Sequence, residues 1–367
     1  MMKILFLTPN LDLPGGVSNF IKLLSEGLDK EKFEINYFFV GKTGSLFKDV
    51  LYPLFIFIHM IRLKKILKKF RPDIVHINPS LASTAVFRDF IFLKIIKNEG
   101  YPVILLVHGW QEKISNTFEN VLFKNYFKNR FDMADTMVVL ADDFKRKLVT
   151  LGLNPNKIFV STTMVNSTQF SQREKVFSQP YDVLFCSTMN KSKGPYELLS
   201  AIPLVIKKYI DTSFTFVGDG KELKKLKAKA REMGIDKNVY FTGYKTGNDK
   251  TLFFKKAHVF VFPSYSEGFP TVVLEAMAAG LPLIITPVGG LVNTIEDGKQ
   301  GLLLEKTTPY PREIAQKILY LFENPEIMQK MSEHNRKEAE EKYDTKIVTK
   351  KIIDRYKEIY INKNNFK

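Results

Sequence analysis

The sequence predicts an α/β protein made of two doubly wound domains, each with a parallel sheet covered by helices on both faces. Its 367 residues suffice for two domains of about 100–200 residues each. Short apolar runs alternate with longer amphipathic stretches, a pattern typical of right-handed βαβ crossovers. A polar stretch without periodicity, Phe170–Gln179, separates two such series. We therefore place a domain boundary near residues 170–180.

Ten apolar runs have the length and composition of strands. Five precede the polar stretch: Lys3–Thr8, Ile35–Val40, Asp73–Ile77, Val103–Val107 and Thr136–Leu140. Five follow it: Val183–Ser187, Ser213–Val217, Val239–Thr242, Val259–Phe262 and Leu283–Thr286. The predicted domains are residues 1–176 and 177–345, and a last helix at about 346–362 is available to pack back on the first domain.

Composition and charge restrict the class of protein. With 45% hydrophobic and 26% charged residues the chain is not disordered, and its one cysteine, Cys186, excludes an intramolecular disulfide. The 55 Lys+Arg against 39 Asp+Glu give a net charge of +16, which attracts phosphorylated ligands, nucleic acid or an anionic membrane. The N-terminal MMKILFLT lacks a signal-peptide pattern, and the longest apolar run, Leu51–Ile61, is about half of a membrane span. We expect a cytoplasmic protein, with peripheral membrane contact left open.

The most informative segment runs from Val259 to Thr286. A predicted strand is followed by a turn containing Glu267 and Gly268, and Thr271 is expected to cap a helix that carries Glu275. Free backbone N–H groups at such a helix start bind phosphate. The two carboxylates suit hydroxyl groups of a sugar or a ribose, although acidic residues also complement a helix dipole without any ligand.

This segment resembles the donor-binding signature of the large retaining nucleotide-sugar glycosyltransferase family (family 4, group 1). In that family seven residues separate two glutamates in a Pro-Ser…Glu-Gly-Phe-Pro…Glu-Ala setting. The resemblance continues over most of residues 183–305, at Phe216–Gly220, Val239–Tyr244, Pro287–Gly290, Glu296–Gly298 and Gly301–Leu303. It implies the GT-B fold, two Rossmann-like domains facing each other across a cleft, with the donor site in the C-terminal domain and the acceptor side in the N-terminal one.

The resemblance also implies roles for individual residues. Glu275 would hold the ribose hydroxyls of the nucleotide, and Glu267 would face the transferred sugar. Lys193 matches a phosphate-binding lysine whose charge would stabilise the leaving diphosphate. Backbone amides from Gly268 through Val272 would contact sugar and diphosphate, a stretch that contains Phe269, Pro270 and Thr271. Tyr244, at the end of a matched strand, is also placed in the donor site.

One position departs from the family pattern. Relatives carry an arginine about five residues before the Lys-Gly pair, where this chain has Thr188. Either Lys191 supplies the missing charge, without the bidentate geometry of a guanidinium, or phosphate binding is weaker. The departure puts a two-cation clamp in doubt.

Fewer residues stand out in the N-terminal half. Gly15 and Gly16 follow the first predicted strand and open a helix, so they form either a phosphate-approaching turn or a turn without a ligand. The family has a Gly-Gly pair here that faces the donor phosphates. His108 ends an apolar strand and matches a family Val-His-Gly segment, which implies contact with the sugar or the transition state. His76 ends another predicted strand and is at most a positioning residue.

No residue pattern calls for a metal or a cofactor. The chain has no Asp-x-Asp triplet suited to a metal-held diphosphate, and no clustering of His, Cys and carboxylates at ligand spacing. It also has no evident Ser/His/Asp or Cys/His grouping. We therefore expect metal-independent transfer without a cofactor, in which lysine and helix dipoles neutralise the diphosphate.

A basic stretch occupies Leu46–Arg71. Residues 46–130 hold 14 Lys+Arg and 6 Asp+Glu, a net charge of 14 − 6 = +8. Basic residues interleaved with Leu, Ile and Phe can lie on an anionic membrane, and they can equally form the solvated face of a helix packed on a sheet.

The expected function is transfer of a sugar from a nucleotide diphosphate, such as a UDP-sugar, to a glycan or lipid-linked acceptor in cell-surface polysaccharide synthesis (capsule, O-antigen or lipopolysaccharide). A catalytically silent GT-B protein that binds a glycan or a partner is the alternative from another class. A GT-B epimerase or phosphorylase lacks the matching residue markers here. A nucleic-acid binder is disfavoured, because the chain has no nucleic-acid-binding motif or basic groove rich in aromatic residues.

Overall fold

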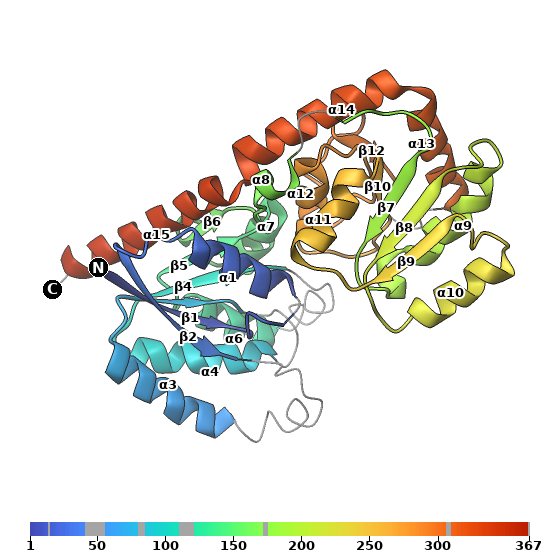
Figure 1. Ribbon diagram of the computed structural model, residues 1–367. Coiled ribbons are helices and arrows are strands. Elements are labelled where there is room, and N and C mark those ends of the chain that lie inside the picture. The colour runs from blue at the N-terminus through green and yellow to red at the C-terminus, as the bar shows by residue number, and fades with distance from the viewer. Residues whose placement is uncertain are drawn as a thin grey trace. The chain divides into compact units, whose positions relative to one another are not determined.

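The computed structural model describes residues 1–13, 15–40, 56–79, 85–109, 121–171, 175–305 and 310–365. The chain forms two compact units, Met1–Met164 with Thr345–Lys367 and Val165–Asp344 (Figure 1). The first stretch therefore ends at Met164, not at residue 176 as predicted. The reason is a long-range pairing, because Val165 forms a β-bridge with Asp344, whose Oδ2 also accepts a 2.6 Å hydrogen bond from Ser167 Oγ.

The first unit contains a six-stranded sheet in the order β2-β1-β3-β4-β5-β6, and every neighbouring pair is parallel. Its strands are β1 (Met2–Thr8), β2 (Phe33–Phe39), β3 (Ile74–Ile77), β4 (Val103–Val107), β5 (Thr136–Val139) and β6 (Ile158–Val160). The sequence predicted five of them. It missed the edge strand β6, whose three residues are too few to show a periodic pattern.

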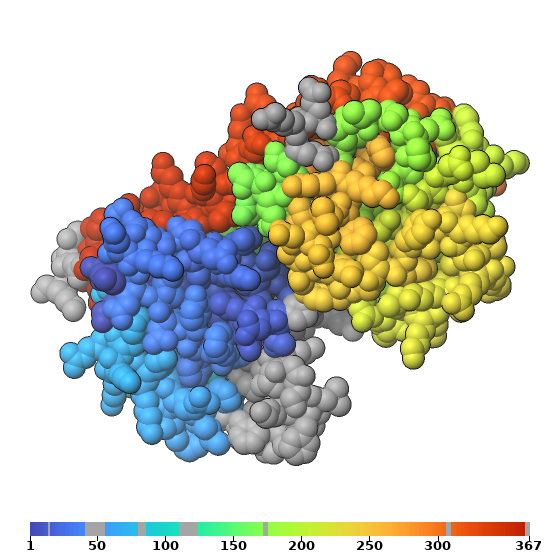
Figure 2. Space-filling model, viewed as in Figure 1, coloured from blue at the N-terminus to red at the C-terminus, as the bar shows by residue number. Residues whose placement is uncertain are grey.

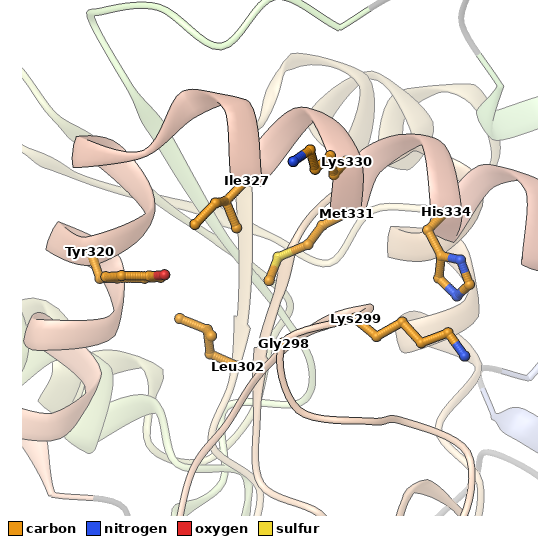
Figure 3. Close-up of a pocket in the computed structure, with 8 residues that line it drawn as sticks. All are labelled: Gly298, Lys299, Leu302, Tyr320, Ile327, Lys330, Met331 and His334. Carbon is orange, nitrogen blue, oxygen red and sulfur yellow. The ribbon is translucent and has the colours of Figure 1, made fainter.

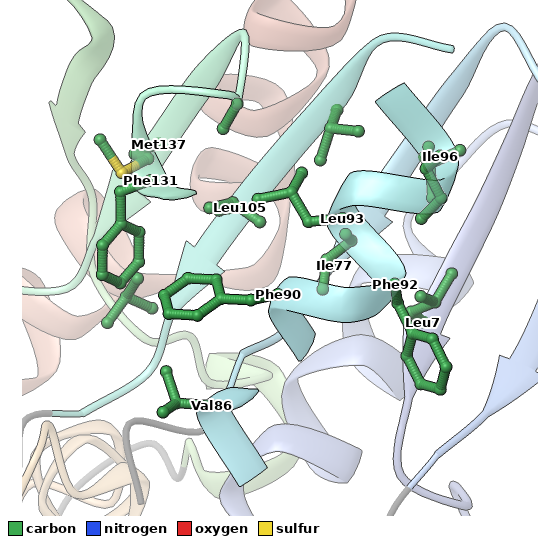
Figure 4. Packing of buried hydrophobic residues seen from close by; sticks show 14 of the residues in the cluster. Leu7, Ile77, Val86, Phe90, Phe92, Leu93, Ile96, Leu105, Phe131 and Met137 are labelled. Atoms are coloured by element: carbon green, nitrogen blue, oxygen red, sulfur yellow. The ribbon is translucent and has the colours of Figure 1, made fainter. Parts of the chain in front are cut away.

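Helices cover this sheet and form the core with it. They are α1 (Gly16–Glu26), α3 (Ile56–Phe70), α4 (Ala85–Asn98), α6 (Val121–Phe131), α7 (Asp142–Thr150) and α15 (Thr345–Asn365). Figure 4 shows Phe90 and Leu93 of α4 packed among Ile77 of β3 and Leu105 of β4, all of them buried. On α15, Tyr356 is fully buried, so the last helix is an integral part of the first unit.

The second unit contains a parallel sheet in the order β12-β11-β10-β7-β8-β9. Its strands are β7 (Asp182–Cys186), β8 (Ser213–Val217), β9 (Val239–Gly243), β10 (Val259–Phe262), β11 (Leu283–Ile285) and β12 (Gly301–Leu303). The unpredicted strand is again a three-residue edge, β12. The helices are α8 (Ser167–Phe170), α9 (Pro195–Ile206), α10 (Leu223–Glu232), α11 (Gly247–Lys256), α12 (Thr271–Ala278), α13 (Pro311–Glu323) and α14 (Pro325–Glu338).

The prediction of two Rossmann-like domains is confirmed, and each sheet has a point at which the strand order reverses. In the first sheet this point lies between β1 and β3, and in the second between β7 and β10. Ligands of doubly wound sheets bind beyond the carboxyl ends of the strands at such a point. No helix among the described residues is both long enough and apolar enough to cross a bilayer.

Candidate functional site

In the second unit the loops after β7 and β10 are joined by hydrogen bonds. Tyr265 N donates to Ser192 O at 3.0 Å, and Ser264 Oγ lies 3.2 Å from the same oxygen. Gly194 makes this approach possible, because it has φ +73° and a Cβ there would lie 2.1 Å from Pro263 O. A side chain would meet backbone that cannot move aside. The close approach of the two loops therefore requires glycine at position 194, and it places Lys193 against the loop after β10.

Lys193 and Glu267 form an ion pair where these loops meet. The distance from Lys193 Nζ to Glu267 Oε1 is 2.6 Å, and the side chains are 23% and 11% exposed. Ser264 Oγ donates to the same Oε1 at 2.7 Å, and Lys193 Nζ lies 3.4 Å from Ser266 O. The structure thus joins two of the predicted catalytic residues and keeps both partly accessible.

The turn that carries Gly268 leads into helix α12. Gly289 has φ +59°, a Cβ on it would lie 2.2 Å from Glu267 O, and Gly290 N donates to Gly268 O at 2.6 Å. The Gly289-Gly290 pair therefore shapes the turn by allowing close backbone packing. Phe269 is only 7% exposed and belongs to the core.

The start of α12 corrects two expectations. Thr271 is the first residue of the helix and not its cap, a position taken by Pro270 with φ −73° and ψ 114°. Pro270 is buried and has no N–H, so it cannot contribute an amide to the predicted row of donors. The amides of this row therefore belong to Gly268, Phe269, Thr271 and the half-buried Val272.

Glu275 lies inside α12 and is 7% exposed. Its Oε2 pairs with Nζ of Lys250 from α11 at 2.5 Å. Sequence reasoning did not identify Lys250, because nothing distinguishes it from the other lysines of this basic chain. The only available signal was its place on the helix that follows β9 and precedes β10.

The three remaining predicted donor residues lie on the surface. Thr188 is exposed, and its carbonyl accepts a 2.8 Å hydrogen bond from Asn190 N. Lys191 is exposed at the start of the short helix Lys191–Lys193. Tyr244, just beyond β9, is 56% exposed. Thr188 and Lys191 come after the carboxyl end of β7, and Tyr244 comes after that of β9. Ligands of doubly wound sheets bind beyond these strand ends.

In the first unit Gly15 and Gly16 begin helix α1. Gly15 precedes the helix with φ 166°, an extended conformation open to any residue. A Cβ on Gly15 would meet only Ser18 Oγ, at 3.9 Å, and one on Gly16 would meet nothing within 4 Å. No contact with the described residues therefore requires a glycine at either position.

His108 follows β4 and is held by Asn78, which follows β3. Asn78 Nδ2 donates to Leu7 O at 3.2 Å, which directs Oδ1 toward His108 Nε2 at 2.8 Å. Nε2 must therefore carry the proton, and Nδ1 keeps a lone pair. Burial lowers the pKa of His108 to about 3, although part of its surface stays accessible. Asn78, a polar residue directly after a buried strand, was not singled out from the sequence.

His76 has a structural environment. It lies within β3 and not at its end, and it is fully buried. Its Nδ1 is 2.6 Å from the hydroxyl of Tyr356 on α15. Burial, together with the nearby His108, lowers the pKa of His76 to about 3. The ring is therefore neutral and connects the last helix to the sheet.

A pocket of about 390 Å³ lies elsewhere in the second unit, at the edge strand β12 (Figure 3). Ile327 and Met331 of α14 point into it toward Leu302, and Lys299 and His334 lie at one side. None of the predicted site residues lines it. Within the described ranges no group of three or more His, Cys, Asp and Glu residues is placed to hold a metal ion.

Two Rossmann-like domains with paired charges at a strand-order reversal define the protein as a GT-B type. The model of the family "Glycosyl transferases group 1" matches residues 166–338, and that of "Glycosyltransferase Family 4" matches residues 14–169. The two models together account for residues 14–338. The chain therefore belongs to the group 1 glycosyltransferases.

Relatives and solved structures agree with this family. An uncharacterized glycosyltransferase of Methanocaldococcus jannaschii is 30% identical over 68% of this chain and 66% of its own length. The capsular polysaccharide biosynthesis glycosyltransferase CapM of Staphylococcus aureus is 23% identical over 80% of this chain and 87% of its own. The crystal structure of HepE from Anabaena in complex with UDP has a TM-score of 0.77 at 15% identity, over 97% of this chain and 100% of that one. This last likeness shows the GT-B fold.

Proposed function

We propose that the protein is a retaining, metal-independent glycosyltransferase that moves a sugar from a nucleotide diphosphate to a glycan or lipid-linked acceptor in cell-surface polysaccharide synthesis. The observation that carries this proposal is the Lys193–Glu267 pair beside the turn into α12, with Glu275 further along the same helix. Membership of the group 1 family and similarity to the capsular enzyme CapM support it. The UDP bound by HepE supports a UDP-sugar donor.

In the proposed reaction Lys193 changes partner. Lys193, which pairs with Glu267, moves to the donor diphosphate, and this leaves the Glu267 carboxylate to accept hydrogen bonds from the sugar hydroxyls. The bond from the anomeric carbon to the diphosphate oxygen breaks, and the acceptor oxygen bonds to that carbon on the same face. The acceptor proton passes to the leaving phosphate oxygen. Lys193 stabilises the charge that develops there.

His108 has a matching role in the first unit. A neutral imidazole with its lone pair on Nδ1 accepts a hydrogen bond from a sugar hydroxyl, because Asn78 already takes the proton of Nε2. The open space before Gly15 and Gly16 receives the donor phosphates at the start of α1.

A catalytically silent GT-B protein that binds a glycan or a partner is the second candidate. Thr188 favours it, because an exposed threonine replaces the arginine of the family pattern. Nucleotide release decides between the two candidates. Nucleotide sugars are first screened by the rise in melting temperature that specific binding causes, and release is then measured with and without candidate acceptors. Release that depends on an acceptor supports the transferase, and a bound donor without release supports the binding protein.

Two further experiments test whether the transfer retains the anomeric configuration and whether it needs a metal. The anomeric configuration of the product, read by NMR, distinguishes retention from inversion. Turnover should change little with EDTA. Strong loss that Mg²⁺ or Mn²⁺ restores would contradict transfer without a metal.

We also propose that α3 rests on the anionic inner face of the cell membrane. Phe57, Ile58 and Ile61 are 65%, 47% and 43% exposed near the start of this helix. The lysines of its second half, Lys64, Lys65, Lys68 and Lys69, are exposed as well. The helix lies on the outside of its unit, in lighter blue (Figure 2).

Exposed apolar side chains beside basic ones suit a membrane surface and would bring the enzyme to a lipid-linked acceptor. Residues 41–55, which hold the rest of the basic stretch, lie outside the described residues.

A further inference from the structure

Lys250 is the partner of Glu275 and has no role in the proposed reaction so far. It lies on α11, while Glu275 lies on α12. Nζ of Lys250 contacts Oε2 of Glu275, and the side chains are 20% and 9% exposed. The pair therefore lies at the edge of the core, with some surface left to each side chain.

Fold stability alone is a weak reason for such a pair. Two charges lose their hydration when they are buried, and their attraction offsets this loss only in part, so an apolar pair of similar volume is often at least as stable. The neighbouring buried positions of α12 are indeed apolar, namely Val273, Leu274, Ala276 and Met277. A carboxylate kept in this environment points to a ligand that it binds.

The geometry of the pair suits a diol. A carboxylate has two oxygens with about four acceptor positions. Lys250 contacts Oε2 of Glu275, which leaves Oε1 as the acceptor for a pair of vicinal hydroxyls. Without the lysine, a carboxyl group this deeply buried would favour its neutral form, which accepts hydrogen bonds less well.

We propose that Lys250 is a positioning residue of the donor site, which keeps Glu275 ionised and oriented to accept hydrogen bonds from the vicinal hydroxyls of the donor's ribose. This assignment rests on the proposed function, because it assumes a nucleotide donor. It adds a residue that acts through Glu275 and touches no reacting atom.

The charged surroundings support an ionised pair. Burial is the largest single influence and lowers the pKa of Lys250, but the charge and the hydrogen bond of Glu275, together with smaller effects of other groups, raise the pKa on balance. The other ionisable groups that act on Lys250 are Cys186 at the end of β7 and Tyr244 beyond β9. Burial raises the pKa of the Cys186 thiol to about 12, so it is neutral at physiological pH and does not compete for the lysine.

Discrimination between ribose and deoxyribose tests the assignment. Calorimetry would give Kd for UDP and GDP, each against its 2′-deoxy counterpart, in the wild type and in Lys250→Met, Lys250→Arg and Lys256→Met. Lys256 is the matched control, because it lies on the same helix with its side chain 74% exposed. Losing a hydrogen bond to a charged group changes affinity about 10-fold to 100-fold. The wild type, Lys250→Arg and Lys256→Met should prefer the ribonucleotide by such a factor, and in Lys250→Met the ratio of the two Kd values should approach one.

Each outcome has a distinct meaning. A folded Lys250→Met protein that keeps the wild-type preference would overturn the positioning role. Wild-type protein that binds neither UDP nor GDP would overturn the proposed donor site itself, and this assignment with it. If Lys250→Met does not fold, Lys250→Gln, which lacks the charge that keeps Glu275 ionised, is measured in its place with Glu275 intact. A ratio that falls toward one in this variant supports the assignment, and a wild-type preference contradicts it.

Discussion

At the scale of single residues, the charged side chains of the proposed donor site in the second unit form two ion pairs. Lys193 pairs with Glu267, and Lys250 pairs with Glu275. The first pair is the more accessible, and its lysine is 23% exposed. In the proposed reaction an incoming diphosphate replaces the Glu267 carboxylate as the partner of Lys193, so substitution of this lysine is expected to affect turnover more than folding.

Lys193→Ala should lower turnover about 10²–10³-fold, the typical loss when one donor is removed from a site that stabilises developing charge. Its effect on folding should be small, because Ser264 still donates to Glu267 in the variant. Steady-state rates together with thermal melts would measure both effects, and Lys193→Arg serves as the charge-retaining control. Near-normal turnover would assign the role to Lys191 or remove it altogether.

The residues that the sequence could predict are those with a local cause. Lys193 precedes Gly194, whose positive φ and contact with Pro263 O require glycine, so the pair stands out as a short motif. Lys250 and Asn78 have no such mark. Their importance comes from the partners Glu275 and His108, which only the folded chain brings to them.

At the scale of elements, burial decided which strands could be predicted. Central strands such as β4 are buried at every residue and appear as apolar runs in the sequence. The two strands that were missed, β6 and β12, lie at sheet edges and have three residues each. Both are only partly buried, whereas β11, which also has three residues, is buried at every residue and was predicted.

The start of α1 allows a test of the glycine pair that leaves the fold intact. Gly16→Ala should keep or slightly raise the melting temperature, because the new Cβ meets open space and alanine favours a helix. Donor affinity should fall, since the methyl group takes space in which the donor phosphates approach the amides at the helix start. Calorimetry with the nucleotide and a thermal melt measure the two effects. If the stable variant binds the nucleotide as tightly as the wild type does, Gly15 and Gly16 form a turn that contacts no ligand.

Helix α3 can be tested with lipid vesicles. Replacement of Lys64, Lys65, Lys68 and Lys69 by glutamine should sharply reduce binding to anionic vesicles, because each charge contributes about 1 kcal/mol near the surface. Added salt should have the same effect through screening. The matched control replaces four exposed lysines of the second unit, Lys221, Lys224, Lys225 and Lys227.

In the lysine variant of α3, turnover should fall on a lipid-linked acceptor and survive on a short water-soluble one. Equal loss in the control variant would mean that net charge alone drives binding. Wild-type protein that ignores anionic vesicles at low salt would leave α3 as a solvated helix face.

At the scale of the whole molecule, the first unit is built from both ends of the chain, because Thr345–Lys367 joins Met1–Met164. The alternation of strands and helices predicts two sheets, but it does not indicate where the polar linking segment belongs. Val165 and Ser167 join the second unit through Asp344, a contact almost two hundred residues away in sequence. The boundary therefore depends on a long-range pairing that no local pattern shows.

The buried histidine between β3 and the last helix should make the first unit sensitive to acid. His76 is neutral in the fold, with a pKa lowered from 6.5 to about 3 by burial. The unfolded chain takes up this proton near pH 6.5 and the folded chain only near pH 3. The free energy of unfolding should therefore be unaffected above pH 6.5 and fall as the pH drops below it, by about 1 kcal/mol per pH unit.

Urea unfolding at several pH values, followed by the amide hydrogen exchange of β3, reports on the first unit. His76→Gln keeps a polar partner for Tyr356 but cannot titrate, so the fall in stability below pH 6.5 should be shallower in this variant than in the wild type. The remaining slope includes His108, whose pKa is lowered in the same direction, and carboxylates that titrate at lower pH. Equal slopes in the two proteins would show that His76 does not titrate on unfolding, which would contradict a neutral, buried ring in the native unit.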